Sequence, residues 1–223
     1  MNYEQARFNM IEQQIRPWEV LDSQVLALLA IIKREEFVPA AYKALAFADM
    51  EIPLSSNLQK NPSQCMLSPK VEARLLQDLA VQKHEKVLEI GTGSGYMTAL
   101  LAHRAQHVTT LEIDATLAQT ARNNLQRAGI FNADVRVADG TDTAARQGQF
   151  DVIVLSGSVA DVPAALLEQL KAGGRLSAVV GFEPVMRATL MTRVGQAAWH
   201  STQAWDTVAP RLLGFPEPSK FSF

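Results

Sequence analysis

The chain has 223 residues, of which 48% are hydrophobic and 20% are charged. This length and composition fit one α/β domain with a small appendage and exclude a disordered chain. The formal net charge is −2, so no basic excess draws the chain onto nucleic acid or an anionic membrane, and we expect neither partner. No apolar run approaches the roughly 18 residues of a membrane span, and no apolar signal core follows the N-terminus. These absences predict a cytoplasmic location, and the oligomeric state stays open.

Residues 1–85 are predicted to form helices and a long irregular loop. Hydrophobic residues at helical spacing between positions 8 and 15 predict a helix that ends at Pro17. Asp22 suits the N-cap of a second helix over 25–32. Four prolines interrupt residues 37–69, and so long a loop in a compact domain is usually functional. We expect residues 1–85 to pack on a core of residues 86–223 as one compact unit, with the loop on the substrate side.

Strand and helix patterns alternate through the middle of the chain. Short apolar runs predict strands at 86–90, 108–111, 135–137, 152–155 and 175–180. Helical patterns lie between them at 96–105, 115–128 and 163–170. Such alternation with short connections predicts a mostly parallel sheet with helices on both faces, an α/β fold of Rossmann-like type. Two further β-leaning runs, 188–194 and 197–206, predict an antiparallel finish to that sheet.

The strongest functional signal is a glycine-rich turn that follows the first predicted core strand. Residues 87–90 are Val-Leu-Glu-Ile, and Gly91-Thr92-Gly93-Ser94-Gly95 then leads into a helix. Glycines suit this position because the backbone turns tightly and a ligand approaches it without obstruction by Cβ atoms. The strand before the loop and the helix after it give the motif the context of a nucleotide-binding turn.

Glu112 extends this pattern to the next strand. It lies 21 residues after Gly91, at the end of the second predicted strand, and Ile113 follows it. A carboxylate at this offset reaches the two ribose hydroxyls of a bound nucleotide. NAD and S-adenosylmethionine both carry such a ribose, so Glu112 by itself does not distinguish between them.

Three other features favour S-adenosylmethionine. The loop lacks the later glycine that packs the helix of a dinucleotide fold on its strand. Glu89 precedes the loop, where a carboxylate would repel a pyrophosphate but suits a cationic sulfonium. The third strand leads into Asp139-Gly140, placed to contact an adenine. The predicted cofactor contacts are Glu89, Gly91, Thr92, Gly93, Ser94, Gly95, Glu112, Ile113, Asp139 and Gly140. Asp151 either pairs locally or contacts the ligand.

These motifs, together with several flanking segments, resemble the protein-L-isoaspartate O-methyltransferase family over nearly the whole chain. The resembling segments are Lys33-Arg34-Glu35-Glu36-Phe37-Val38-Pro39, the glycine loop with its flanks, Asp139-Gly140, Phe150-Asp151-Val152-Ile153, and residues 162–176. The resemblance implies methyl transfer from S-adenosylmethionine, with S-adenosylhomocysteine as product, to an isomerised aspartate in a damaged protein or peptide. A carboxylate is ionised at neutral pH and can attack the methyl group directly, so this chemistry needs neither a metal nor a general base. We accordingly predict no metal site.

The sequence departs from the family at the substrate end. The family carries Thr-Ile-Ser-x-Pro ahead of the glycine loop, and its serine hydroxyl serves the active site. Here the stretch is Cys65-Met66-Leu67-Ser68-Pro69, so Leu67 stands at the serine position. Ser68 and Ser63 are weaker candidates to supply a hydroxyl, and Met186 stands where the family tends to carry a glutamine. Three functions therefore stay open: isoaspartyl methylation, methylation of another acceptor, and cofactor binding without catalysis.

Overall fold

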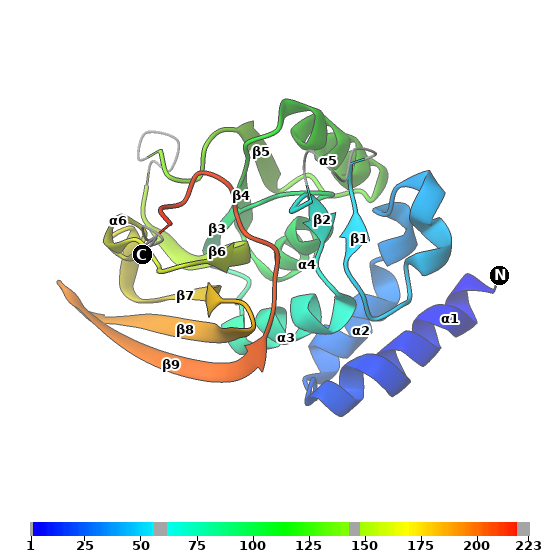
Figure 1. Ribbon diagram of the computed structural model, residues 1–223, viewed down its shortest axis with the longest axis horizontal. Coiled ribbons are helices and arrows are strands. Elements are labelled where there is room, and N and C mark those ends of the chain that lie inside the picture. Colours follow the sequence, from blue (N-terminus) through cyan, green and yellow to red (C-terminus); the bar gives the residue numbers. More distant parts are fainter. Residues whose placement is uncertain (1, 56–61, 143–147, 218–223) are drawn as a thin grey trace, which may run out of the picture.

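The computed structural model describes residues 2–55, 62–142 and 148–217, which fold around a seven-stranded sheet (Figure 1). The strand order is β5-β4-β3-β6-β7-β8-β9. Their bounds are β3 Lys86–Ile90, β4 His107–Glu112, β5 Ala133–Val137, β6 Phe150–Val159, β7 Leu170–Phe182, β8 Val185–Gly195 and β9 Ala198–Thr207. Strands β5, β4, β3, β6 and β7 pair in parallel, whereas β8 and β9 extend the sheet as antiparallel strands. The predicted antiparallel finish is therefore confirmed.

The N-terminal region packs beside the sheet at the opposite end of the molecule from the β8–β9 ribbon (Figure 1). Its helices are α1 Tyr3–Met10, η1 Ile11–Ile15, η2 Arg16–Trp18, α2 Ser23–Ile31, η3 Arg34–Glu36, η4 Ala40–Leu45 and α3 Pro69–Leu79. The Asp22 side chain caps α2 by accepting the N–H groups of Gln24 and Val25, as predicted. The predicted stop at Pro17 is wrong, because helical conformation continues through it to Trp18 in a final 3₁₀ turn.

The long segment before α3 contains more regular structure than the sequence predicted. Besides η3 and η4, it contributes the short antiparallel pair β1 Ile52–Pro53 and β2 Cys65–Met66. Met66 pairs with Ile52, and both side chains are buried. This pair fixes the chain immediately ahead of Leu67, so the described part of the substrate-side loop has a defined position next to the glycine turn.

Helices cover the two faces of the sheet unequally. One face shares a large core with α1 to α3, α4 Tyr96–Arg104 and α5 Ala115–Arg127. Among the described residues, the other face is covered by the short helix α6 Ala164–Leu167 and by a C-terminal segment that contributes Phe215. The predicted helix over 163–170 is thus too long, because β7 already begins at Leu170. The predicted division at residue 85 stays a prediction, although residues on both sides of it share one core.

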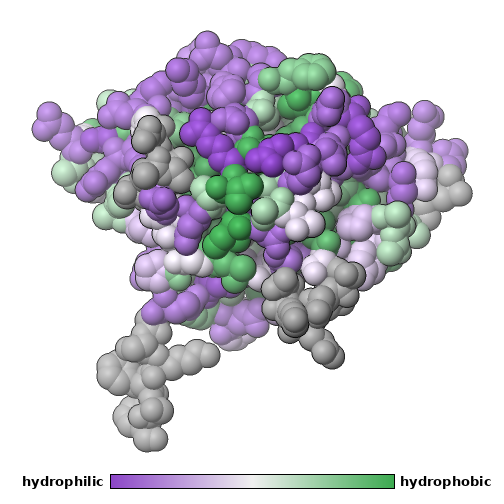
Figure 2. Space-filling view, turned by 90° about the horizontal axis from the view of Figure 1, so that it is seen from above, coloured by the Kyte–Doolittle hydropathy of each residue, from purple (hydrophilic) through white to green (hydrophobic). Residues whose placement is uncertain are grey.

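The sheet places the functional motifs at one edge. The parallel strands β3, β4 and β5 end at Ile90, Glu112 and Val137, so the glycine turn, Glu112 and the segment from Ala138 onward lie side by side. Ligands of open α/β sheets bind at the carboxyl ends of their strands. The molecule seen from above carries hydrophobic side chains in the middle of this view, between hydrophilic flanks (Figure 2).

Candidate functional site

The glycine turn has the geometry that its sequence predicts. Gly91 adopts a φ of +93°, and its N–H donates to the Leu111 carbonyl oxygen at 2.9 Å. An added Cβ at Gly91 would lie 2.8 Å from Leu212, so this position accepts only glycine without a shift of the neighbouring chain. Gly95 has a different task. It is the N-cap residue of α4 and would place a Cβ against Leu125 and Ala121 of α5, so it lets the two helices pack closely.

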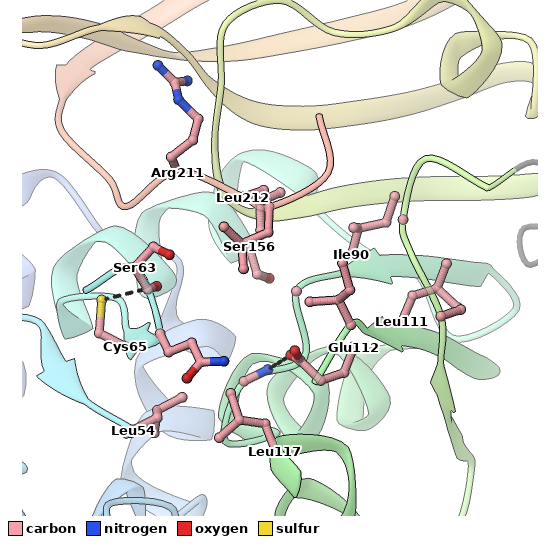
Figure 3. Close-up of a pocket in the computed structure, with 17 residues that line it drawn as sticks. Leu54, Ser63, Cys65, Ile90, Leu111, Glu112, Leu117, Ser156, Arg211 and Leu212 are labelled. Atoms are coloured by element: carbon pink, nitrogen blue, oxygen red, sulfur yellow. Dashed lines mark hydrogen bonds between the residues drawn. The ribbon is translucent and has the colours of Figure 1, made fainter. Parts of the chain in front are cut away.

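A cavity opens above this turn, and we refer to it as the main cavity. It is lined by Leu54, Ser63, Gln64, Cys65, Ile90, Gly91, Gly93, Leu111, Glu112, Ile113, Leu117, Ala138, Gly140, Ser156, Arg211, Leu212 and Leu213. In Figure 3, Leu54, Ser63 and Cys65 lie across the opening from Ile90, Leu111 and Glu112. The structure therefore brings the substrate-side loop and the predicted cofactor residues together around one space.

Glu112 lies in the wall of the main cavity with both carboxylate oxygens hydrogen-bonded. One oxygen accepts the Gly93 N–H at 2.8 Å and the other accepts the Asp114 N–H at 3.0 Å. Burial raises the pKa of this carboxyl, and the two backbone donors oppose that rise. Each carboxylate oxygen can accept a second hydrogen bond. Glu112 is thus a fixed acceptor that can still receive the hydroxyls of a ribose.

Gly140 forms part of the same wall, at the end of the third predicted strand. An added Cβ would lie 2.2 Å from Cγ2 of Ile90, so no larger residue fits beside the cavity. The Asp139 carboxylate instead accepts the N–H and hydroxyl of Thr141, at 2.8 and 2.7 Å. Of this pair, Gly140 lines the main cavity and Asp139 shapes the turn next to it.

Glu89 is fully buried within the sheet and does not line the main cavity. Its carboxylate accepts hydrogen bonds from Thr98, Thr110 and Ser156, the last at 2.8 Å. Burial raises its pKa to about 7, against the three hydroxyl donors. The structure therefore places Glu89 behind the cavity wall, where it organises hydroxyl groups, one of which lines the cavity.

The remaining residues of the glycine loop divide between two spaces. Gly91 and Gly93 line both the main cavity and a smaller side crevice. Thr92 and Ser94 line the side crevice but not the main cavity. The side crevice is lined by Cys65, Met66, Leu67, Glu72, Gly91, Thr92, Gly93, Ser94, Tyr96, Met97 and Ser156. The side crevice therefore extends from Leu67, which stands at the family's serine position, to the glycine turn.

Leu67 is buried in the wall of the side crevice, 5% exposed. Ser68 is the N-cap residue of α3, where its side chain makes no capping hydrogen bond, and it lines neither space. Ser63 does line the main cavity. Met186 is buried on β8, paired with Gly181 and Thr207. Of the two weaker serine candidates, the structure brings only Ser63 to the cavity.

Cys65 lines both the main cavity and the side crevice, but its environment makes it a poor nucleophile. Burial and the nearby Glu51 carboxylate raise the pKa of its thiol to about 12. The thiol is therefore protonated at neutral pH, whereas the thiolate is the reactive form. Asp151 is engaged locally, since it accepts the Lys86 N–H at 2.8 Å and pairs with Lys171 at 2.7 Å.

Sequence reasoning missed three residues that shape the site. Ser156 on β6 lines both spaces, Leu212 covers the glycine turn, and Gln64 joins the two sides by donating to the Asp114 carboxylate at 3.1 Å. These residues lie in segments that are far apart in the sequence. The signal that could have identified Ser156 is a hydroxyl residue directly after the strand predicted over 152–155.

No group of three or more His, Cys, Asp or Glu side chains in residues 2–55, 62–142 and 148–217 could hold a metal ion. Within the same residues, no helix is long and apolar enough to cross a membrane.

The sheet, the glycine turn and the cavity at the strand ends define a Rossmann-like methyltransferase fold. A Plasmodium falciparum structure with S-adenosyl-L-homocysteine, described as a protein-L-isoaspartate O-methyltransferase, aligns with a TM-score of 0.73 at 16% identity, covering 95% of this chain and 99% of that one. A second solved structure of that description aligns with a TM-score of 0.74 at 21% identity, over 93% of this chain and 66% of its own. These likenesses show the fold.

Sequence comparisons place the chain more narrowly. The sequence model of the protein-L-isoaspartate(D-aspartate) O-methyltransferase family matches residues 5–205. A protein-L-isoaspartate O-methyltransferase from Koribacter versatilis (strain Ellin345) is 40% identical over 208 residues, covering 93% of this chain and 90% of that protein. One from Rhodopseudomonas palustris (strain ATCC BAA-98 / CGA009) is 36% identical over 216 residues, covering 94% and 96%. The chain belongs to the protein-L-isoaspartate O-methyltransferase family and is an S-adenosylmethionine-dependent methyltransferase.

Proposed function

We propose that this protein transfers a methyl group from S-adenosylmethionine to the carboxylate of L-isoaspartyl residues in damaged proteins and peptides. The observation that carries the proposal is the position of the substrate-side loop. Ser63, Gln64 and Cys65 line the same cavity as Gly91, Gly93 and Glu112, so an acceptor held by the loop meets a donor held by the glycine turn. Membership of the family supplies the acceptor class.

The chain's own residues fit the methyl donor. Gly91 and Gly93 would let it approach the turn, Gly140 allows the cavity wall to pack closely on Ile90, and Glu112 would accept hydrogen bonds from the ribose hydroxyls. Ile113, which is 44% exposed at the cavity, supplies apolar contact for the adenine. The bound donor contributes a methyl group on a positively charged sulfur. The predicted contact through Glu89 becomes an indirect one, because that carboxylate lies behind Ser156.

The proposed reaction needs positioning more than proton transfer. A carboxylate oxygen forms the new bond to the methyl carbon while the sulfur–methyl bond breaks, giving a methyl ester and a neutral thioether. No proton has to move, because the acceptor carboxylate is already ionised at neutral pH. Holding two reactants in the correct geometry can lower such a barrier by about 7–11 kcal/mol. The task of the chain is therefore to hold, align and desolvate the two groups.

A second candidate function is methylation of a different acceptor, and Leu67 is the observation that favours it. A buried leucine side chain at the family's serine position offers no hydrogen bond to a carboxylate. The same feature would also suit a protein that binds the cofactor without transferring its methyl group.

One experiment separates these functions. The purified protein is incubated with methyl-labelled S-adenosylmethionine and matched peptides that differ only in carrying isoaspartate or aspartate. Base-labile label on the isoaspartyl peptide alone supports the proposal, and Gly93→Val should abolish it, because that substitution fills the turn. Absence of label together with cofactor binding measured by calorimetry would overturn isoaspartyl methylation and leave the silent binding protein. Label on another acceptor would instead support the second candidate.

A further inference from the structure

Ser156 occupies a position that no other described hydroxyl residue shares. The residues common to the main cavity and the side crevice are Cys65, Gly91, Gly93 and Ser156, and within the described part of the chain only Ser156 among them has a hydroxyl group. It therefore faces both the glycine turn and the crevice that contains Leu67. Figure 3 shows it beside Leu212, between the two sides of the main cavity.

An irregularity in β6 sets the direction of this side chain. The parallel register with β7 shifts between Val154 and Ser158, which pair with Ser177 and Val179. Three residues of β6 thus stand opposite one residue of β7, and Ser156 is the middle one. Such bulges redirect side chains next to functional sites. The C-terminal segment holds this irregularity in place. The Ser158 carbonyl oxygen accepts the Leu212 N–H at 2.9 Å, and the Ser158 N–H donates to the Pro210 carbonyl oxygen at 2.7 Å.

The Glu89 carboxylate fixes the orientation of the Ser156 hydroxyl by accepting its hydrogen bond. The Ser156 Oγ atom donates to the Glu89 carboxylate at 2.8 Å, and Thr98 and Thr110 hold the same carboxylate from α4 and β4. A hydroxyl has one donor and two acceptor positions. The two acceptor positions of the Ser156 hydroxyl stay available. They lie on the partly exposed side of Ser156, because the Glu89 carboxylate on the other side is fully buried.

We propose that Ser156 contacts the acceptor in place of the serine that Leu67 has replaced, and that Glu89 is the positioning residue that orients it. This inference rests on the proposed function, because it assigns a residue to the isoaspartyl acceptor. The chemistry fits a group with an amide N–H beside its carboxylate, which an isoaspartyl residue presents. The one proton of the Ser156 hydroxyl is donated to Glu89, so its oxygen accepts a hydrogen bond from the amide N–H of the acceptor.

The test compares four variants in the full-length protein. Ser156→Ala removes the hydroxyl, Ser156→Thr keeps it, and Ser156→Ala/Leu67→Ser returns a hydroxyl at the family's position. Ser201→Ala is the matched control, since it removes a serine hydroxyl from an exposed position on β9 that lines neither space. The measurements are kcat and KM for the isoaspartyl peptide, binding of that peptide with S-adenosylhomocysteine present, and the Kd of S-adenosylhomocysteine by calorimetry.

Ser156→Ala should lower kcat/KM for the isoaspartyl peptide by roughly two- to tenfold, the range for one hydrogen bond between neutral groups. The Kd of S-adenosylhomocysteine should stay within about twofold, Ser156→Thr should retain activity, and the double variant should regain part of the loss. Unchanged kcat/KM, an equal loss in Ser201→Ala, or an equal loss of cofactor affinity would each overturn the inference. A wild-type protein that neither methylates nor binds the isoaspartyl peptide would refute the proposed function, and this inference with it.

Discussion

The guanidinium of Arg34 donates to the backbone carbonyl oxygen of Leu67 at 2.7 Å, and so ties the N-terminal region to the loop beside the glycine turn. Arg34 is fully buried. It also donates to the Ala46 carbonyl oxygen at 3.1 Å, forms an ion pair with Glu72, and lies 5.1 Å from the ring centroid of Tyr96, the first residue of α4. The Arg34 side chain therefore fixes the substrate-side loop relative to α4, the helix that follows the glycine turn.

Replacing Arg34 should destabilise the fold strongly. Arg34→Met leaves the buried Glu72 carboxyl without its cation, and breaking a buried pair in this way typically costs about 3–5 kcal/mol. Arg34→Met/Glu72→Leu should be less destabilised than the single variant, because no unpaired charge remains. Urea denaturation measures both. Arg136→Gln, in an exposed pair with Asp134, is the control and should cost less than about 1 kcal/mol. An Arg34 effect no larger than this control would contradict the assignment.

The stability of the protein should fall as the pH rises from 5 to 7. Burial raises the pKa of Glu89 from its ordinary value of 4.5 to about 7, so between these values the folded state holds a proton that the unfolded state has released. Each such group contributes a slope of up to about −1.4 kcal/mol per pH unit in this window and none above it. Glu89→Gln should make the profile shallower between pH 5 and 7.

The exposed residue Glu36 provides the control for that measurement. Denaturant melts of wild type, Glu89→Gln and Glu36→Gln are recorded at half-unit steps from pH 5 to 8. Wild type and Glu36→Gln should run in parallel. If Glu89→Gln kept the wild-type slope, the buried carboxyl would titrate at an ordinary pKa and the Glu89 network would be assigned incorrectly.

Gly140→Ala should weaken cofactor binding while leaving a folded protein. The new methyl group would lie 2.2 Å from Ile90 Cγ2, so the cavity wall has to shift. We expect the Kd of S-adenosylhomocysteine to rise at least about tenfold, an effect of about 1.4 kcal/mol. Gly195→Ala is the matched control, because a Cβ there would meet only the Ala198 Cβ, at 3.4 Å, within 4 Å. Equal affinity in the two variants, measured by calorimetry, would remove Gly140 from the cofactor site.

Cys65 should react slowly with alkylating reagents. A thiol with a pKa of about 12 has a thiolate fraction at pH 8 roughly a thousandfold below that of an ordinary cysteine. Glu51→Gln should speed the reaction by removing a neighbouring negative charge. Saturating S-adenosylhomocysteine should slow it further, because Cys65 lines the main cavity. Mass spectrometry of the alkylated chain follows all three rates, and rapid labelling of wild type would contradict the buried, protonated thiol.

Local patterns predicted the part of the site that is continuous in sequence. The strand, turn and helix around Gly91 follow from the adjacent residues 87–96, and the offset to Glu112 follows from one β-α-β unit. Glu89 was predicted to face the cofactor, but its direction depends on hydroxyl groups from α4, β4 and β6 that surround it. A pattern within one strand carries no information about such distant partners.

The helices show the same limit. Residues 163–170 have a helical pattern, yet α6 ends at Leu167. Leu170 already belongs to β7, where it pairs with Phe150 of β6. Ser156 could not be assigned from sequence for a related reason. Its direction depends on a register shift that the C-terminal segment stabilises from more than 50 residues away.

That C-terminal segment has a consequence for the order in which the protein is made. Leu212 lies 2.8 Å from the positions where Gly91 of the glycine turn and Gly157 of β6 would carry a Cβ, so it packs where both residues lack a side chain. Translation proceeds from the N-terminus, and the glycine turn is therefore synthesised some 120 residues before the side chain that covers it. A nascent chain that stops before Pro210 has its sheet strands but lacks one wall of the pocket. The wall of the cavity at the glycine turn is thus complete only after Leu212 has been added to the chain.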